Sequence, residues 1–384
     1  MAPPAAGTGS SNATPVIEIK RPDPSIASRT HEHPGLANGT RVLVAGGKGG
    51  AIADATVSQL LSAGCKVTVL GSATAAATSG CSVVEGSVAS PGACMEAVAG
   101  QEVVVHAGRE LSGSGCSASE GMLEGTRNLL EAAASAGVKG FVFASSAGVV
   151  FEGRDLKEVS EDTPYANRFA DPVEAATAEA EKAVLRANAS VASSSAVAPG
   201  KMLTCSVRAG TVYGPGESEP LIPGLASRAK ARTRPVGDGG NTVDFVYAGN
   251  VAHALLLAAE ALLSPTAPSE GVGGNPTPIP SPAAGKAFFV TDAEPVPYSE
   301  FAGRVLSRLG YPGPDDAGGA GGIPVWLAVV LAFLLRVFAL VVSPIFQFRP
   351  ALTPLRVAEE SKVRRFSVSR ALKNLGYAPL WTLE

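Results

Sequence analysis

A glycine-rich turn between an apolar strand pattern and a helix pattern constrains the fold of this chain more than any other feature. The strand pattern RVLVAGG starts at Arg41, the helix pattern KGGAIADATVSQLLSAG follows it, and a second strand pattern, KVTVL, starts at Lys66. Strand, helix and strand in this order and at these lengths are typical of a βαβ unit in a parallel sheet. In such a unit the glycines allow a tight turn, and the helix N-terminus can receive a pyrophosphate.

The same alternation continues as far as residue 150. The segments VVEGSV, EVVVHAG and FVFASS have the character of buried strands, and ACMEAVAG and EGTRNLLEAAASAG have that of helices. The last strand ends at Ser145 and Ser146, a long polar loop follows, and a helix begins at Pro172 with Asp171 as its expected cap. We therefore expect an α/β fold, a Rossmann-type doubly wound parallel sheet.

Composition narrows the class of protein. With 384 residues, 46% of them hydrophobic, the chain is long enough for one large domain or two modest ones. The net charge is −3 and no long block of like charges occurs, so nucleic-acid binding is not expected. The five cysteines are odd in number and include no C-x-x-C pair, which indicates reduced thiols and no metal site.

Three stretches carry a more specific signal. They are FVFASSAGVVFEGRD with the helix DPVEAATAEAEKAVLRAN, the segment VRAGTVYGPGE, and the run GDGGNTVDFVYAGNVAHA. In this order they resemble the 3β-hydroxysteroid dehydrogenase family of extended short-chain dehydrogenase/reductases, and above all its sterol-4α-carboxylate 3-dehydrogenase (decarboxylating) branch. The resemblance covers about residues 41–384, linkers excepted. It implies NAD(P)-dependent oxidation of a sterol 3β-hydroxyl group, with a small C-terminal substrate region above the strand ends.

The resemblance also shows what the catalytic helix lacks. The family motif there is D-P-Y-S-x-T-K-A-x-A-E, in which the Tyr transfers the hydroxyl proton and the Lys lowers the pKa of that Tyr and holds the nicotinamide ribose. Here the Tyr position is Val173 and the Lys position is Thr177, and neither side chain titrates near neutral pH. Ser146, with Ser145 beside it, remains as a candidate catalytic residue that orients a carbonyl or hydroxyl group. A serine alone, however, has no means of activation.

Two other residues are weighed as substitutes for the missing pair. Tyr165 lies in the loop before the helix and would have to swing into the site. Lys182 lies on the same helix, but about 140° around it from Thr177, so we expect its side chain to point elsewhere.

Several positions that correspond to family residues near NAD or NADP have also changed. The third glycine of the family's turn is Ile52, whose side chain is expected to push the helix off the strand. Gly71 stands where the family has the acid that binds the adenosine ribose. Ser87 stands where the family has the Asp near the adenine, and Ala209 where it has the Pro near the nicotinamide. Lys48 is interpreted either as a phosphate contact or as an exposed loop lysine. The expected cofactor-site positions are Gly46, Gly47, Lys48, Gly49, Ile52, Gly71, Ser87, His106, Ala107 and Ala209.

The segment 325–342 is the most apolar in the chain and holds one charge, Arg336. A charge near the middle of a span costs roughly 2.5–3.5 kcal/mol for insertion, so a helix lying in one leaflet is favoured, with Trp326 at the interface. A buried helix of a soluble domain is the alternative. In the resembling family a similar segment attaches the protein to a membrane. We therefore expect a cytosol-facing, membrane-associated protein of the endoplasmic reticulum, with plastids and lipid droplets as alternatives.

These observations predict five parts of the chain: a disordered leader (1–40), a Rossmann domain (41–263, with 211–240 in the substrate region), a disordered insertion (264–285), a C-terminal substrate and membrane region (286–384), and within it the apolar helix 325–342. The changed cofactor face favours a degenerate family member that acts as a membrane-bound scaffold or sterol-binding subunit. The alternatives are an active NAD(P)-dependent sterol dehydrogenase that uses substituted residues, and an isomerase or reductase that acts on another lipid. The expected partner is a sterol or other lipid-like small molecule, and a homo- or hetero-oligomer stays open.

Overall fold

The structure is a computed structural model, and it describes most of the chain. The described residues are 36–46, 50–71, 80–108, 118–169, 172–188, 202–216, 221–231, 236–264, 269–270, 276–277, 281–311, 322–342 and 352–383. The expected cap Asp171, the turn residues Gly47, Lys48 and Gly49, and residues 1–35 of the expected leader lie outside them.

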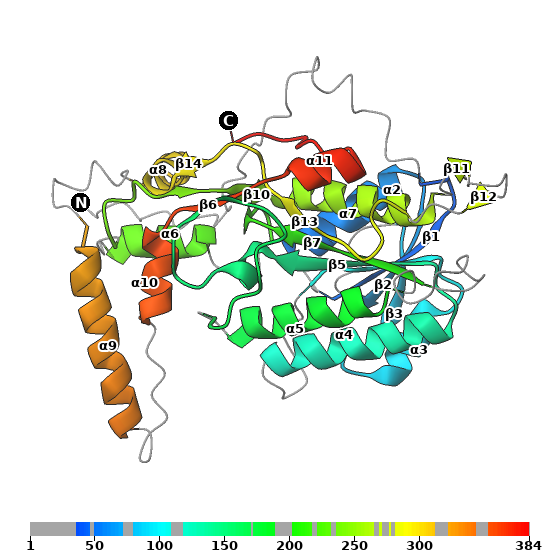
Figure 1. The fold of residues 1–384 in the computed structure, drawn as a ribbon, viewed down its shortest axis with the longest axis horizontal. Helices are drawn as coiled ribbons and strands as arrows, with labels where there is room; N and C mark the ends of the chain where they lie inside the picture. Colours follow the sequence, from blue (N-terminus) through cyan, green and yellow to red (C-terminus); the bar gives the residue numbers. More distant parts are fainter. Residues whose placement is uncertain are drawn as a thin grey trace, which may run out of the picture.

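A seven-stranded sheet, parallel throughout, forms the centre of the molecule (Figure 1). Across the sheet the order is β13 (Ala287–Val290), β7 (Leu203–Ala209), β5 (Gly140–Ser146), β4 (Val103–His106), β1 (Arg41–Ala45), β2 (Lys66–Gly71) and β3 (Ser82–Glu85). The chain order reverses between β1 and β4, which is where ligands bind in sheets of this kind. The predicted doubly wound parallel sheet is confirmed.

Helices cover both faces of this sheet, as Figure 1 shows. One face carries α3 (Pro91–Val98), α4 (Ala118–Ser135) and α5 (Pro172–Arg186), and the other carries α2 (Ala51–Ser62), α7 (Ala248–Leu263) and α11 (Ser369–Leu375). Because the central strands are covered on both sides, they are apolar along their whole length; every residue of β4 is buried. The two helix layers therefore enclose two separate apolar cores, one on each side of the sheet.

A second, smaller region lies beyond the carboxyl ends of the strands. Its four-stranded sheet has the order β14 (Val296–Pro297), β9 (Thr242–Val243), β15 (Arg364–Phe366) and β6 (Leu156–Val159). The other elements here are the short helix η2 (Ala147–Val150), the pair β8 (Thr211–Tyr213) and β10 (Phe245–Tyr247), and the helices α6 (Leu221–Ala231), α8 (Tyr298–Arg308) and α10 (Pro354–Ser361). The sequence predicted only a polar loop where β6 forms, and the short helix η2 was not predicted.

The predicted disordered insertion, 264–285, needs a correction at its C-terminal end. Ser281 and Ala283 are buried, and the Ser281 hydroxyl donates a hydrogen bond to the carbonyl of Ala261 at the end of α7. A short antiparallel pair, β11 (Ser269–Glu270) with β12 (Pro276–Thr277), also forms. Residues 281–285 thus belong to the packed fold because they contact α7, and the other residues between 265 and 280 lie outside the described part.

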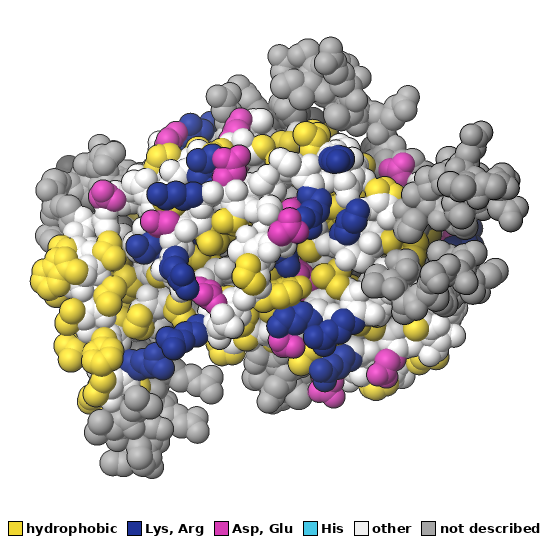
Figure 2. All heavy atoms as spheres, viewed as in Figure 1, with side chains coloured by type: hydrophobic (Ala, Val, Ile, Leu, Met, Phe, Trp, Pro, Cys, Tyr) yellow, Lys and Arg dark blue, Asp and Glu magenta, His cyan; other side chains and the backbone are white. Residues whose placement is uncertain are grey.

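The helix α9 (Val325–Val342) has the bounds predicted for the apolar segment. Among the side chains of α9 that the structure describes, only Ala328 and Ala332 are buried, in a cluster with Val357 of α10. Its large apolar side chains are exposed: Trp326, Leu327, Val329, Val330, Leu331, Phe333, Leu334, Val337 and Phe338. The alternative of a buried soluble helix is therefore wrong. Figure 2 shows apolar side chains gathered over α9, with basic side chains beside them. Within the described residues no helix is both long and apolar enough to pass through a bilayer.

Candidate functional site

The candidate site lies where β5, β7 and the first turn of α5 meet. In the sheet register Ser146 at the end of β5 stands opposite Ala209 at the end of β7, and Ser145 stands opposite Arg208. Ser145 is buried and its hydroxyl oxygen has no hydrogen-bond partner among the described residues, whereas Ser146 is half-buried. Ser146 is therefore the serine whose contacts define this site.

The Ser146 hydroxyl is held by a carboxylate that sequence reasoning missed. It donates to Oε1 of Glu174, in the first turn of α5, at 2.9 Å, and its oxygen accepts the N–H of Gly148 at 3.0 Å. A Cβ added at Gly148 would lie 2.7–3.0 Å from the Glu174 carboxylate atoms, so a larger residue there would have to displace that side chain. The signal available in the sequence was a glutamate beside the two changed catalytic positions, where the family motif has a serine.

The two changed positions of the catalytic helix have no acid–base group. Thr177 is buried, and its hydroxyl donates to the backbone carbonyl of Val173 at 2.8 Å, one helical turn back. A threonine bonded in this way closes its own helix turn and does not reach across to Ser146. Nothing at these two positions can carry a proton during catalysis near neutral pH.

Neither proposed substitute reaches this position. The hydroxyl of Tyr165 donates to Oε1 of Glu181 at 2.6 Å, and burial, followed by the nearby carboxylate charge, raises the pKa of Tyr165. Lys182 binds Glu179 at 2.7 Å and lies 4.7 Å from the centre of the Tyr165 ring. The expectation that Lys182 points away from Thr177 is confirmed, and the Tyr165 hydroxyl is bound to Glu181.

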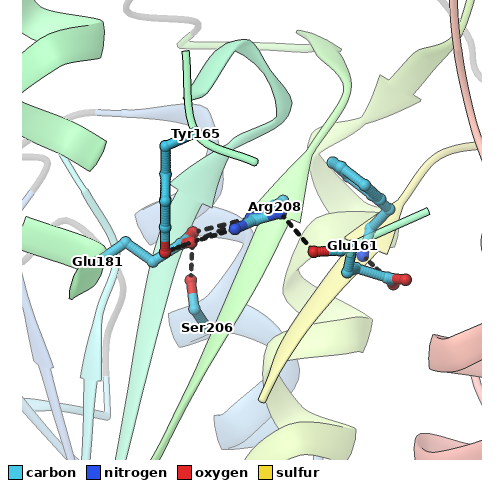
Figure 3. A network of polar contacts seen from close by, with 6 residues as sticks. Glu161, Tyr165, Glu181, Ser206 and Arg208 are labelled. Carbon is cyan, nitrogen blue, oxygen red and sulfur yellow. Dashed lines mark hydrogen bonds and ion pairs between the residues drawn. The ribbon is translucent and has the colours of Figure 1, made fainter. Parts of the chain in front are cut away.

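That contact belongs to a buried ionic network that anchors α5 to the sheet (Figure 3). Arg208 donates from Nη2 to Oε1 of Glu181 at 2.7 Å and from Nε to both carboxylate oxygens, and Ser206 donates to Oε2 at 2.9 Å. Glu181 and Arg208 are 0% and 3% exposed in their side chains. Arg208 also reaches the carbonyl of Glu161. The network fixes the helix that carries Glu174. The polar groups of its members bind one another.

There is no room for a side chain at Gly46, the first glycine of the expected nucleotide-binding turn. Gly46 has φ of 80°, and a Cβ there would lie 2.4 Å from the carbonyl oxygen of Gly108 and 2.9 Å from the His106 ring. His106 is buried between the Ala45 carbonyl and the Thr126 hydroxyl, and burial lowers its pKa to about 4, so it is neutral at physiological pH. These contacts make His106 a structural support of the turn.

The expected clash at Ile52 is not seen. The side chain is half-buried and packs against the core between α2 and the sheet, and α2 contacts β1, β2 and α7. At the start of this helix the N–H of Ala51 donates to the carbonyl of Gly216 at 2.8 Å. A helix N-terminus binds phosphate through such N–H groups, so the chain itself occupies one of them.

Two positions on the expected adenosine side lie among the described residues. Gly71, at the end of β2, has no side chain, and an added Cβ would find only Val69 within 4.0 Å. Ser87 uses its hydroxyl to accept the N–H of Ala89 at 3.1 Å in its own turn. The last two of the expected positions, Ala107 and Ala209, are buried at the ends of β4 and β7. Gly71 therefore offers no side-chain contact to a ribose hydroxyl group.

The fold and this site define the class of protein: a Rossmann-fold member of the short-chain dehydrogenase/reductase type. A model of the 3-beta hydroxysteroid dehydrogenase/isomerase family matches residues 43–317, and the chain belongs to that family.

Two relatives and one solved structure illustrate the relationship. The chain is 36% identical over 263 residues to the mouse sterol-4-alpha-carboxylate 3-dehydrogenase, decarboxylating, a match that spans 68% of this chain and 64% of that protein. It is 34% identical over 265 residues to 3beta-hydroxysteroid-dehydrogenase/decarboxylase isoform 2 of Arabidopsis thaliana, a match that spans 68% of this chain and 42% of that protein. The chain thus matches less than two thirds of the length of each. Streptomyces venezuelae dTDP-glucose 4,6-dehydratase, solved with NAD bound, shares the fold with a TM-score of 0.59 and 20% identity, over 88% of this chain and 92% of that one.

Proposed function

We propose that this chain is a family member that has lost hydride transfer and acts as a lipid-binding scaffold or sterol-binding subunit. The observation that carries the proposal is the bond between Thr177 and the Val173 carbonyl. Where the family resemblance expects the Tyr and the Lys, this helix carries side chains without a titratable group, and the threonine hydroxyl is bonded within its own helix. Removing one partner of a catalytic unit removes most of its rate, and here both are absent.

The nucleotide side supports the same proposal. The relatives' names describe dehydrogenases, and the family resemblance implies NAD or NADP. In this chain Gly71 offers no acid to the ribose and Gly216 takes an N–H of the α2 N-terminus. Weak or absent dinucleotide binding is therefore the expected consequence.

Calorimetry with NAD⁺ and NADP⁺, followed by an assay with a 3β-hydroxysterol acid, tests the proposal. We expect no dinucleotide binding in the micromolar range and no turnover. We also expect V173Y/T177K to stay inactive until Gly71→Asp restores the ribose acid, for which the backbone leaves room. Micromolar binding together with turnover by the unmodified chain would contradict the proposal.

A second candidate is an active NAD(P)-dependent sterol dehydrogenase that uses a substituted residue. The observation that favours it is the hydrogen bond from Ser146 to Glu174, because a carboxylate can accept a proton that a serine passes on. In the same assay this candidate requires turnover by the unmodified chain and its loss in Glu174→Gln.

The exposed helix α9 supports a membrane-associated location for this function. A contiguous apolar surface of this size marks an interaction site, and an amphipathic position in one leaflet would cover Trp326, Phe333 and Phe338 while Arg336 reaches the headgroups. The endoplasmic-reticulum surface, facing the cytosol, is the proposed location, and a sterol or similar lipid is the proposed ligand.

Vesicle flotation tests the role of α9. Introducing Phe333→Glu and Leu334→Glu places two charges on the exposed face, and we expect vesicle binding to weaken by roughly tenfold or more. Leu372→Glu is the matched control, because Leu372 is 58% exposed but lies on α11, away from this helix. Equal binding by the α9 variant and the control would contradict the membrane role.

A further inference from the structure

We propose that the exposed apolar face of α9 docks on membranes that carry negatively charged lipids, with Arg336 and Lys362 as contacts to the anionic headgroups. The inference rests on the proposed membrane-associated location and adds the class of lipid that this surface selects. Three observations carry it: the direction in which α9 presents its apolar side chains, the position of its one charge, and the charge of the C-terminal part of the chain.

The first step is the orientation of α9. Ala328 and Ala332 pack against Val357 of α10, so this side of the helix faces the fold. Val330 and Leu334 each follow one of these alanines by two residues and therefore point about 160° away from it. Both are exposed, at 47% and 57%. The apolar face of α9 thus points away from the fold, and Figure 2 shows apolar side chains at this outer edge of the molecule.

The second step is the position of Arg336. It lies four residues after Ala332, about 40° around the helix, and its side chain is exposed. Arg336 therefore borders the apolar face on the side nearest to the fold. When that face enters a leaflet, a long basic side chain at its border extends to the level of the headgroups. The Arg336 guanidinium group makes no ion pair with a described residue, so its charge can act on a lipid phosphate.

The third step is the charge of the C-terminal part of the chain. Between residues 322 and 384 the sequence holds eight Lys and Arg residues against three Glu residues, a net charge of +5, although the whole chain has a net charge of −3. The positive charge is therefore concentrated in the part that carries α9. Lys362, directly after α10, is a second cation that makes no ion pair with a described residue. Basic side chains lie beside the apolar ones of α9 in Figure 2.

An anionic membrane fits this surface better than the other possible occupants do. Of the acids in this region, Glu360 binds Arg228 at 2.5 Å and Glu158 lies 3.7 Å from Arg365. Each Lys or Arg near an anionic membrane strengthens binding by about fivefold, so Arg336 and Lys362 together are expected to contribute roughly 10- to 30-fold. A neutral membrane would cover the apolar face but would leave these charges without partners. A second copy of the chain would bring a like net charge onto the face.

The experiment compares vesicles of phosphatidylcholine alone with vesicles in which about three lipids in ten are phosphatidylserine. At about 0.1 M salt the full chain is expected to bind the anionic vesicles at least about tenfold more tightly, and the preference should shrink at about 1 M salt because the charges are screened. In R336Q/K362Q the preference is expected to fall by roughly tenfold. Binding of this variant to neutral vesicles should stay unchanged, which also shows that it is folded.

The matched control is K66Q/R127Q. It removes the same two kinds of charge from exposed positions on β2 and α4, and it should keep the preference of the unmodified chain. Equal binding of both vesicles by the unmodified chain, a preference retained in R336Q/K362Q, or an equal loss in both variants overturns the inference alone. Binding to neither kind of vesicle overturns the proposed location, and the inference with it. A dimer seen by light scattering in that case would identify a second copy as the occupant of α9.

Discussion

At the scale of single residues, the helix turn lacks the family's Tyr and Lys and carries a carboxylate at the position after the missing Tyr. The family's catalytic helix carries its reactive groups at the positions of Val173 and Thr177, and this chain instead carries a carboxylate at Glu174. A phenol beside an ammonium group both donates and accepts hydrogen bonds, whereas a carboxylate only accepts them. The three changed positions together therefore alter the hydrogen bonds that this helix turn can make.

The buried pair of Glu181 and Arg208 gives a prediction at the same scale. Both side chains are almost fully excluded from water, so removing either partner leaves an uncompensated buried charge. We expect Arg208→Met and Glu181→Gln each to lower the free energy of unfolding by about 3–5 kcal/mol. The double variant should lose less than the sum, because neither charge then remains. Urea unfolding of the four proteins measures this cycle.

The neighbouring pair of Lys182 and Glu179 is the control for that cycle. It lies on the same helix, but its side chains are 27% (Lys182) and 54% (Glu179) exposed, so Glu179→Gln should change the free energy of unfolding by less than about 1 kcal/mol. Additive losses in the double variant of Glu181 and Arg208 would show that the two charges do not depend on each other.

At the scale of secondary-structure elements, the sequence predicted those strands and helices that depend on local residue patterns. The strands β1, β4 and β5 are runs of apolar residues buried on both faces, and α5 begins at Pro172 as its proline and alanines indicate. The strand β6 was missed because its parallel partner is β15, about two hundred residues later in the chain. LKEV alternates too little to identify a strand unless that partner is known.

The candidate site was predictable to a similar degree. The residues around Ser146, Val173 and Thr177 match the family without a gap. The resemblance therefore located Ser146 and the two positions that lack the Tyr and the Lys. It did not show that Tyr165 is bound to Glu181, that Glu174 reaches Ser146, or that Gly216 caps α2, since each contact joins elements far apart in the sequence or in a loop. Such contacts depend on tertiary packing, which no local pattern encodes.

At the scale of the whole molecule, one buried carboxylate joins the sheet, the smaller region and the end of the chain. Asp292, just after β13, accepts hydrogen bonds from the Tyr213 hydroxyl at 2.9 Å, the N–H of Tyr247 at 3.0 Å and the Asn250 amide at 2.6 Å. The same Asn250 side chain accepts the N–H of Trp381 at 3.0 Å. This cluster thus links the C-terminal residues to α7.

The stability of the molecule should depend on pH through Asp292. Burial raises its pKa to about 7 from the ordinary 3.8, even though three donors favour the ionised form. The folded state therefore holds a proton that the unfolded state releases, so the stabilising contribution is complete below about pH 4 and is lost as the pH rises to about 7. Over that interval we expect the free energy of unfolding to fall by up to about 4 kcal/mol because of this group.

Thermal unfolding between pH 4 and pH 8 separates this effect from other titrations. Asp292→Asn should start from a lower stability, because the amide cannot accept from all three donors, but its stability should decline less over the interval than that of the unmodified chain. Asp244, whose pKa burial raises to about 6, contributes in the same direction in both proteins, so the difference between the two curves reports Asp292. Glu300→Gln, which removes an exposed partner of Arg304, should leave the slope unchanged. Parallel curves for the unmodified chain and Asp292→Asn would mean that this carboxylate stays ionised inside the fold, and that the three hydrogen bonds outweigh its loss of hydration.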